Sequence, residues 1–583
     1  MTHETHEWVT GDTASTGGVT VEGLLGVRGA PGARGRVVRE GTVALAVVGD
    51  CLASEQELRA ALPAMRRGQW VECTRWPGSY WVIADNGRQR FVCGDLAGVR
   101  PVYYTMRGAT AAWASEARLL GCPLVADLPW LAAGLAVGEH HWPHRTAYEQ
   151  IRLVPGGHGL LLTSGTPPQL VDISGIEPVD ELRQGADRFG RALTGAVQDR
   201  ARAAGGVVGA DLSGGLDSSS AVVLAADAGR VHAVTYTDGY TSAEDTSFAA
   251  RVAQHCRIKH TVAAGAEEQL PFSFPAGQPA GTEPVLEAAM YAMDDSYLRP
   301  VRGLPLHLTG HGGDVVLDAS GACWVRLLQD GHRREAHRQV VAYARLRNTA
   351  PGPYWKALKQ AATLGRSGAL EHAADALERG MTATEPAAGG WSWCRLGAGA
   401  SWLTDQGRQQ VAAMLRQAAR DRQPEHADVF DEWAALWSVG ASARGWEPYA
   451  RALGIRPVYP YLDNQVVRTA FAVPAVARRG MLSYKPLLRA ALPQLPHWLT
   501  SRRSKGSFTA QRIAGLARHH QRLDELITSS PLAAEGLIDP AAVRTALARA
   551  ARGQSATAIA DLHQLIVTCW WLTGHKPALE TAC

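Results

Sequence analysis

Between about residues 20 and 170, short apolar runs alternate with turn residues, a pattern that predicts a β-rich region. The runs at 80–84 and 90–93 flank Asp85-Asn86-Gly87, a sequence typical of the turn in a β-hairpin. Other apolar runs predict strands at residues 43–48, 102–105 and 159–163. We therefore expect a β-rich first domain over residues 1–178.

The pattern changes near residue 180. Apolar residues recur at helical spacing within 175–202, namely Leu182, Phe189, Leu193 and Val197. Strand, turn and helix then alternate to about residue 320, which predicts a mostly parallel sheet covered by helices. The expected elements are strands at 207–210, 231–236 and 304–309 and a helix at 247–253. Beyond residue 325 the chain is rich in Ala, Leu and Arg and should be largely helical, so an α/β second domain is expected over residues 179–583.

Composition narrows the classes of protein only moderately. The 583 residues carry a net charge of +4, which does not indicate a nucleic-acid partner. No apolar run approaches the ~18 residues of a membrane helix, and the polar start is unlike a signal peptide. The nine cysteines form no CxxC pair. We expect a reduced, cytoplasmic protein with no membrane or nucleic-acid partner and no cysteine-built metal site.

The stretch DLSGGLDSSS, residues 211–220, carries the first candidate chemistry. It lies between a predicted strand and a helix expected to begin at Ser218 or Ser219, so glycines and free helix N–H groups can bind a phosphate. Asp217 would repel phosphates unless a cation lies between them, which indicates a nucleotide with Mg²⁺. The alternative is a Ser/Gly turn with a capping Asp. The stretch matches neither GxxxxGK[ST] nor GxGxxG.

A second loop, residues 309–314 with the sequence TGHGGD, follows the predicted strand at 304–309. Both loops should lie at the carboxyl ends of parallel strands, where ligands bind. Asp314 could then meet Asp217 across one Mg²⁺ ion, although it could instead be the N-cap of the next helix. His311 could act as an acid or base, or simply donate a hydrogen bond.

Together these segments resemble the ATP-pyrophosphatase synthetases of the asparagine synthetase class. Ser213–Ser218 matches the class signature SGGxDS, and Gly310–Asp314 resembles its second magnesium motif. Further resemblances to C-terminal motifs lie at residues 456–463, 485–489 and 503–508. Segments similar to the glutamine amidotransferase domain of the class lie at residues 78–85, 94–104 and 151–158. The resemblance implies an Ntn-hydrolase-like first domain followed by an ATP-pyrophosphatase synthetase domain.

By this resemblance the cofactors are ATP and Mg²⁺, with Asp217 and Asp314 as the metal ligands. The residues expected to bind the nucleotide are Leu212, Ser213, Gly214, Gly215, Leu216, Asp217, Ser218, Val234, Thr235, Tyr236 and Gly310. Lys505 and His311 are the expected catalytic residues, Lys505 by stabilising charge on the α-phosphate and the tetrahedral intermediate. Weaker candidates for phosphate contacts are Lys485, Arg489, Arg502 and Arg503. Six tryptophans of the helical half are expected mostly in the core, with a few lining a peptide groove: Trp391, Trp393, Trp402, Trp433, Trp437 and Trp446.

One departure from the class bears on the nucleophile. Glutamine-dependent members have a nucleophilic Cys after the initiator Met, whereas this chain has Thr2, and its first cysteine is Cys51. An N-terminal Thr could itself be a nucleophile, but we expect the first domain to lack glutaminase activity. An amine of the substrate would then attack, as in β-lactam synthetase and in lasso-peptide macrolactam synthetase. The GHGGDVVL and RRSKGSFT segments look more like the second.

The favoured interpretation is an ATP-dependent macrolactam synthetase. It would adenylate an Asp or Glu side chain of a leaderless core peptide and join it to the N-terminal amine, releasing AMP and pyrophosphate. The resemblance also implies a leader-binding protein and a leader peptidase in the same pathway. A β-lactam synthetase-like or asparagine synthetase-like enzyme for small molecules is the alternative.

Overall fold

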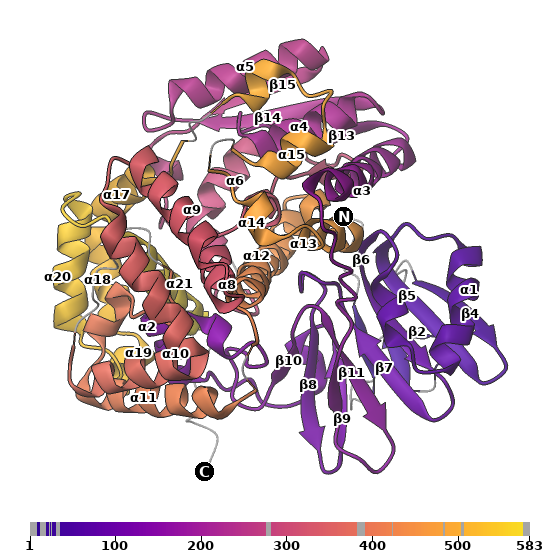
Figure 1. Ribbon diagram of the computed structural model, residues 1–583, viewed down its shortest axis with the longest axis horizontal. Coiled ribbons are helices and arrows are strands. Elements are labelled where there is room, and N and C mark those ends of the chain that lie inside the picture. Colours follow the sequence, from indigo (N-terminus) through magenta and orange to yellow (C-terminus); the bar gives the residue numbers. More distant parts are fainter. Residues whose placement is uncertain are drawn as a thin grey trace.

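The structure is a computed structural model. It describes residues 8–11, 19–21, 24, 26–30, 35–275, 281–381, 391–422, 424–481, 484–502 and 506–574. Figure 1 shows three regions: the N-terminal strands in indigo and purple, a parallel sheet at the top, and a helical half that runs to the yellow C-terminal helices.

The β-rich first region is confirmed and consists of two six-stranded antiparallel sheets. The first has the order β10-β8-β9-β1-β3-β2, with bounds β1 Val9–Gly11, β2 Val19–Thr20, β3 Val27–Gly29, β8 Val102–Arg107, β9 Thr110–Ala114 and β10 Arg152–Val154. The second has the order β12-β11-β7-β6-β5-β4, with bounds β4 Gly35–Glu40, β5 Val43–Cys51, β6 Gly78–Asp85, β7 Gln89–Cys93, β11 His158–Thr163 and β12 Gln169–Asp172.

The second sheet is buried on both faces, and β6 shows how the sequence achieves this. Successive side chains of a strand point to opposite faces. Trp81 and Ile83 therefore pack between the two sheets, whereas Tyr80 and Val82 pack under α1, Glu55–Arg66. The nearly continuous apolar run of this strand follows from that double burial.

A five-stranded parallel sheet confirms the predicted α/β alternation. Its order is β15-β14-β13-β16-β17, with bounds β13 Val207–Asp211, β14 Arg230–Thr237, β15 Lys259–Ala264, β16 His307–Leu308 and β17 Pro457–Val458. The helices α3, Leu182–Ala203, α4, Leu216–Ala226, and α5, Ala243–Cys256, accompany it. β16 is shorter than predicted, since Pro305 has no N–H for a ladder bond. α3 begins later than predicted because an extended segment containing Pro178 precedes it.

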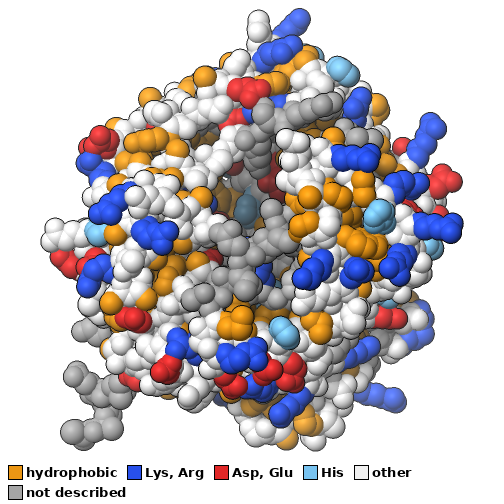
Figure 2. All heavy atoms as spheres, turned by 60° about the vertical axis from the view of Figure 1, so that its left-hand side comes forward, with side chains coloured by type: hydrophobic (Ala, Val, Ile, Leu, Met, Phe, Trp, Pro, Cys, Tyr) orange, Lys and Arg blue, Asp and Glu red, His pale blue; other side chains and the backbone are white. Residues whose placement is uncertain are grey.

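The remainder is largely helical, as predicted. Its helices, after α2 (Leu128–Val137) in the first region, are α6 Tyr291–Tyr297, α7 Gly313–Leu317, α8 Ala322–Gln329, α9 Arg333–Leu346, α10 Pro351–Glu378, α11 Asp405–Arg420, α12 Ala427–Ala452, α13 Asn464–Phe471, α14 Ala475–Arg478, α15 Pro486–Ala491, α16 His497–Thr500, α17 Thr509–Arg518, α18 His520–Thr528, α19 Pro531–Ala534, α20 Pro540–Ala551 and α21 Ile559–Gly574. None of the helices in the described ranges has the length and apolar character that crossing a membrane requires. Figure 2 brings the left-hand side of Figure 1 forward, and the surface in this view is hollowed near its centre.

Buried arginines join the N-terminal sheets to the rest of the chain. Arg200 of α3 is 5% exposed and contacts Asp50 of β5 at 2.7 Å and Asp463 at 2.9 Å. Arg100 contacts Glu447 of α12 at 3.0 Å, and both side chains are at most 10% exposed. Burial raises the pKa of Glu447, but the neighbouring arginines Arg100 and Arg451 hold it below its usual range. The two regions therefore share charged contacts as well as apolar core.

Candidate active site

Two glycines shape the turn between β13 and α4. Gly214 has φ +78°, and a Cβ there would lie 2.2 Å from the carbonyl oxygen of Asp245. Gly215 is the N-cap of α4, which begins at Leu216, two residues before the predicted start. Asp217 therefore lies in the first turn of the helix. The early start places the free N–H groups of the helix directly behind the glycines, where a phosphate can bind.

Hydrogen bonds of side-chain hydroxyl groups stabilise this turn. The Oγ atoms of Ser213 and Ser218 lie 2.9 Å apart, and the backbone N–H of Ser213 donates to Ser218 Oγ at 3.1 Å. The N–H of Gly215 donates to Ser213 Oγ at 3.3 Å. The side chain of Leu216 points into the core and is 4% exposed. The predicted phosphate-binding residues thus form one closed turn, in which Leu216 can contribute only its backbone.

The second loop packs directly against the first, because β16 is the parallel neighbour of β13. A Cβ at Gly310 would lie 2.6 Å from the backbone nitrogen of Ser218, and one at Gly313 would lie 2.5 Å from Cγ of Asp217. Gly312, with φ +87°, is the N-cap of α7, so Asp314 lies in the first turn of this helix. The alternative of Asp314 as an N-cap is therefore wrong, and the predicted meeting of the two loops is confirmed.

A lysine lies between the two carboxylates. Lys485 Nζ donates to both carboxylate oxygens of Asp217, at 2.5 Å to Oδ2, and to Asp314 Oδ1 at 2.8 Å. Its side chain is only 1% exposed, and its backbone has φ +50°. Burial lowers the pKa of Lys485, but the charges of Asp217 and Asp314 raise it above its usual range. The sequence offered Lys485 only as a weak candidate, whereas the structure places it at the centre of the cluster.

The donor set can be compared with what Mg²⁺ requires. Asp217 and Asp314 converge on one point, since a single ammonium group contacts both. Two carboxylates plus nucleotide phosphates suit Mg²⁺, which protein sites typically bind through one or two carboxylates. Among the described residues no group of three or more His, Cys, Asp or Glu side chains could hold a metal ion. The residues therefore fit Mg²⁺ brought by a nucleotide rather than a metal held by the protein alone.

The remaining predicted nucleotide-binding residues lie at the carboxyl ends of β13 and β14. The N–H of Leu212 donates to the carbonyl of Val234 at 2.9 Å, and Thr235 Oγ1 donates to the carbonyl of Leu212. The side chains of Leu212 and Val234 are buried in the core. Tyr236 packs edge-on against Tyr297, with ring centroids 6.5 Å apart. Leu212 and Val234 can thus offer a ligand only their backbone.

His311 lies beside this cluster and faces α12. Its Nε2 lies 2.9 Å from the carbonyl oxygen of Val439. Because a carbonyl can only accept, Nε2 carries the proton, and the basic atom of the ring is Nδ1. The ring packs edge-on against Tyr459, with centroids 5.9 Å apart. That His311 acts as an acid or a base stays a prediction. In such a role, Nδ1 is the ring atom that would accept a proton.

The other predicted cations differ in position. Lys505 and Arg503 lie outside the described residues. Arg502 is 3% exposed and donates to the carbonyl of Gly214 and to Asp245, so it holds the glycine turn in place. Arg489 is exposed on α15. A structural role for Arg502 replaces the phosphate contact considered from the sequence.

Three of the six named tryptophans of the helical half lie in the core, and Trp391 and Trp433 pack against it. Exposed fractions are 2% for Trp393, 3% for Trp402 and 8% for Trp446. Trp391 and Trp433 are partly buried, and so is Trp437, whose indole N–H donates to the carbonyl of Gly156 at 2.9 Å. Trp437 also lines a cavity between the N-terminal region and α12.

Comparison with known proteins agrees with this geometry. Residues 188–573 match the asparagine synthase family, and the chain belongs to that family. No curated protein matches the chain. A glutamine phosphoribosylpyrophosphate amidotransferase from B. subtilis, solved with ADP and GMP, is similar at 13% identity and a TM-score of 0.17, over 52% of this chain and 61% of that one. A structure titled the allosteric regulatory enzyme of purine biosynthesis is similar at 14% identity and a TM-score of 0.17, over 52% and 60%.

This chain thus spans about 60% of the length of those two structures. TM-scores of 0.17 do not assign a fold. The family assignment rests on the match over residues 188–573, which includes both glycine loops and Lys485. The Ntn-hydrolase-like character of the first region and the domain boundary at residue 178 stay predictions.

Proposed function

We propose that this protein is an ATP-dependent, AMP-forming synthetase that closes a macrolactam in a peptide, as lasso-type cyclases do. The observation that carries the proposal is the cluster of Asp217, Asp314 and Lys485 beside the SGGxDS turn. That arrangement supports nucleotide binding, and family membership supports amide formation. The peptide as substrate rests on the motif resemblance given above.

The proposed chemistry solves the problem of a poor leaving group. A side-chain carboxylate oxygen of the substrate attacks the α-phosphorus of ATP, and the bond to pyrophosphate breaks. An amine nitrogen then attacks the acyl carbon, the bond to AMP breaks, and the amine loses its proton to a base. Mg²⁺, when bound, would neutralise phosphate charge. The protein contributes position and charge stabilisation.

The residues of the site have separate roles in this proposal. Backbone N–H groups at the start of α4 bind the pyrophosphate. Lys485 supplies a buried positive charge where negative charge develops. Nδ1 of His311 is the candidate base for the amine, and Lys505 keeps its proposed role at the α-phosphate.

The cysteines of the first region bear on the source of the amine. Burial raises the pKa of those that the structure describes, to about 11 for Cys51 and upward for Cys73, Cys93 and Cys122. A nucleophilic cysteine needs a lowered pKa, so none of the cysteines that the structure describes there suits glutamine hydrolysis. Thr2 lies outside the described residues. We infer that the amine belongs to the substrate itself.

The test is mass spectrometry of linear, leaderless core peptides with the enzyme, Mg²⁺ and ATP, alongside assays of AMP and pyrophosphate. We expect loss of one water from the peptide for each AMP formed. An N-acetylated peptide is the matched control, because it can be adenylated but cannot close the ring. AMP formation with a small amino acid and with no peptide would contradict the proposal and favour a small-molecule synthetase.

A second test concerns Lys505. The variant Lys505→Ala should bind ATP with unchanged affinity and lose product formation, whereas an unchanged rate would remove Lys505 from the mechanism. A leader-binding protein and a leader peptidase remain proposed partners in the pathway.

A further inference from the structure

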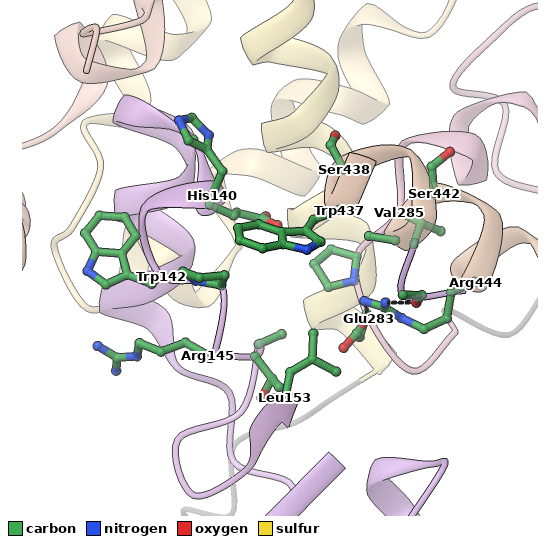
Figure 3. Close-up of a pocket in the computed structure, with 18 of the residues that line it drawn as sticks. His140, Trp142, Arg145, Leu153, Glu283, Val285, Trp437, Ser438, Ser442 and Arg444 are labelled. Carbon is green, nitrogen blue, oxygen red and sulfur yellow. Dashed lines mark hydrogen bonds and ion pairs between the residues drawn. The ribbon is translucent and has the colours of Figure 1, made fainter. Parts of the chain in front are cut away.

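A cavity of about 300 Å³ lies between the N-terminal sheets and the synthetase region, away from the glycine loops. Its wall combines residues 138–147 from the first region, residues 283–287, and one face of α12. Figure 3 shows Trp437 of α12 near the middle, with the Glu283–Arg444 pair on one side and His140 and Trp142 on the other. Both regions of the protein thus contribute to one enclosed space.

The cavity is linked to the candidate active site through α12. The carbonyl of Val439 accepts a hydrogen bond from His311, while Trp437 and Ser438 on the same turn line the cavity. A group held in the cavity would therefore be separated by α12 from the loop that carries Asp314. The proposed chemistry needs a substrate long enough to reach both places, as a peptide is.

The arginines of the cavity are already matched by carboxylates. Arg444 contacts Glu283 at 2.8 Å and also donates to the carbonyl of Gly98 at 2.7 Å. Arg145 is paired with Asp127, which is 4% exposed. The guanidinium of Arg145 points away from Trp437 in Figure 3. Both arginines therefore have a carboxylate partner, and Arg444 also acts electrostatically on Glu139.

Two further glutamates of the wall have neutral hydrogen-bond partners. Glu139 accepts from the amide of Gln564 at 3.3 Å. Oε1 of Glu287 accepts from the hydroxyl of Ser442, and its Oε2 is buried with no hydrogen-bond partner among the described residues. Arg512 acts electrostatically on Glu287, and the buried Nε of Arg512 likewise has no hydrogen-bond partner among the described residues. A buried carboxylate oxygen without a donor is costly, so this wall is built for a cationic ligand.

The titration of the neighbouring groups agrees with this geometry. Burial and the nearby charge of Glu283 raise the pKa of Glu139 from 4.5 to about 7. Burial lowers the pKa of His140 to about 4, so the imidazole is neutral near pH 7 and offers no positive charge. Trp130, Trp142 and Trp437 supply aromatic surface, which also favours cations.

We propose that this cavity binds a cationic group of the substrate, an ammonium or guanidinium, between Glu287 and Glu139 and against the tryptophans. Only the statement that the group belongs to the substrate rests on the proposed function. The negative charges of Glu287 and Glu139 hold the ligand, and the aromatic wall selects a flat or alkyl stem. The cavity thereby anchors a positively charged part of the substrate while its carboxylate lies at the nucleotide.

The experiment uses benzamidinium as the probe, because it stays charged at pH 8 and its neutral isostere is benzamide. Binding to the full-length protein without ATP is followed by calorimetry and by quenching of tryptophan fluorescence. Benzamidinium should bind at least about tenfold more tightly than benzamide. Phenethylammonium, as a second probe, separates a preference for ammonium from one for guanidinium. Equal affinity for benzamidinium and benzamide would overturn the proposal.

Three variants test where in the molecule the probe binds. Glu287→Gln keeps the shape of the side chain and should weaken benzamidinium binding about tenfold. Ala441→Phe fills the cavity and should abolish binding. The matched control Glu371→Gln changes an exposed glutamate of α10 and should leave affinity unchanged. Unaltered affinity in both Glu287→Gln and Ala441→Phe would place the probe elsewhere and overturn the assignment. Because no ATP is used, failure here is distinct from failure of peptide cyclisation.

Discussion

Two acidic sites of this protein balance their charge in opposite ways. At the glycine loops, Asp217 and Asp314 share the ammonium of Lys485, which the chain itself provides. In the cavity beside Trp437, Glu139 and Glu287 accept hydrogen bonds from an amide and a hydroxyl among the described residues. The first site is organised before any ligand arrives, whereas the second is completed by its ligand. The difference indicates which negative charges the protein stabilises by itself and which it leaves to a substrate.

The largest effect should follow from removing the charge of Asp217. Asp217→Asn keeps the shape of the turn but deprives Lys485 of its closest partner and removes one proposed metal ligand. We expect pyrophosphate release to fall more than about 100-fold. A pyrophosphate assay measures this, with circular dichroism as the check on folding. A folded variant that retains most of its activity would show that the carboxylate is not needed at the nucleotide.

Replacing the internal cation tests the comparison directly. Lys485→Met leaves Asp217 and Asp314 facing each other, so the free energy of unfolding should fall by up to about 3 kcal/mol. Mg²⁺ should then stabilise the variant more than the wild-type protein, because the ion takes the place of the ammonium. Thermal unfolding with and without Mg²⁺ measures both effects, and Ca²⁺ serves as a control for ion size. If Mg²⁺ does not raise the unfolding temperature of the variant, these carboxylates need no cation.

The cavity predicts that stability depends on pH, because it contains a buried carboxyl group whose pKa is raised. The pKa of Glu139 is raised from 4.5 to about 7, so its contribution to stability is complete below pH 4.5 and is lost as pH rises through 7. Glu139→Gln should therefore unfold less readily than wild type at pH 8, by up to about 3 kcal/mol, with little difference at pH 4.5. Urea unfolding at the two pH values measures this. Saturating benzamidinium should shrink the difference at pH 8; a difference independent of pH would remove Glu139 from the argument.

The smallest effect concerns the aromatic wall. Trp437→Phe removes the hydrogen bond to the carbonyl of Gly156 and should cost about 1 kcal/mol of stability. Benzamidinium affinity should fall only a few-fold, because a ring remains. Fluorescence titration, using the remaining tryptophans, measures it. A loss as large as that of Glu287→Gln would mean that stacking, and not charge, dominates binding.

The sequence predicted the turns of the two glycine loops and their adjacency well, because the signals for them are local. A strand, two glycines and a helix start within a few residues require a tight turn, and the parallel sheet brings the second loop beside the first. The start of α4 was misplaced by two residues, since serines are good caps but Gly215 is the one in cap geometry. The role of Lys485 could not be derived, because 268 residues separate it from Asp217 and only the fold makes them neighbours.

The cavity was harder still to foresee. Trp437 was considered from the sequence only as one of several tryptophans. Glu139 and Glu287 carry no local signal, because an isolated glutamate is usually a solvated surface residue. Their partners come from other parts of the chain, as Gln564 does for Glu139. What distinguishes the cavity is that its wall carries more carboxylates than arginines, and that is a property of the packed structure.

The arginines that join the two regions also bear on how such a chain can change over evolutionary time. Cutting away the N-terminal sheets would leave Arg200 paired with Asp463 but not with Asp50, and Glu447 paired with Arg451 but not with Arg100. It would also expose to water the apolar core that the two regions share, which is unfavourable. The N-terminal sheets are therefore part of what keeps the rest of the chain folded, so such a chain would keep them whatever reaction they carry out.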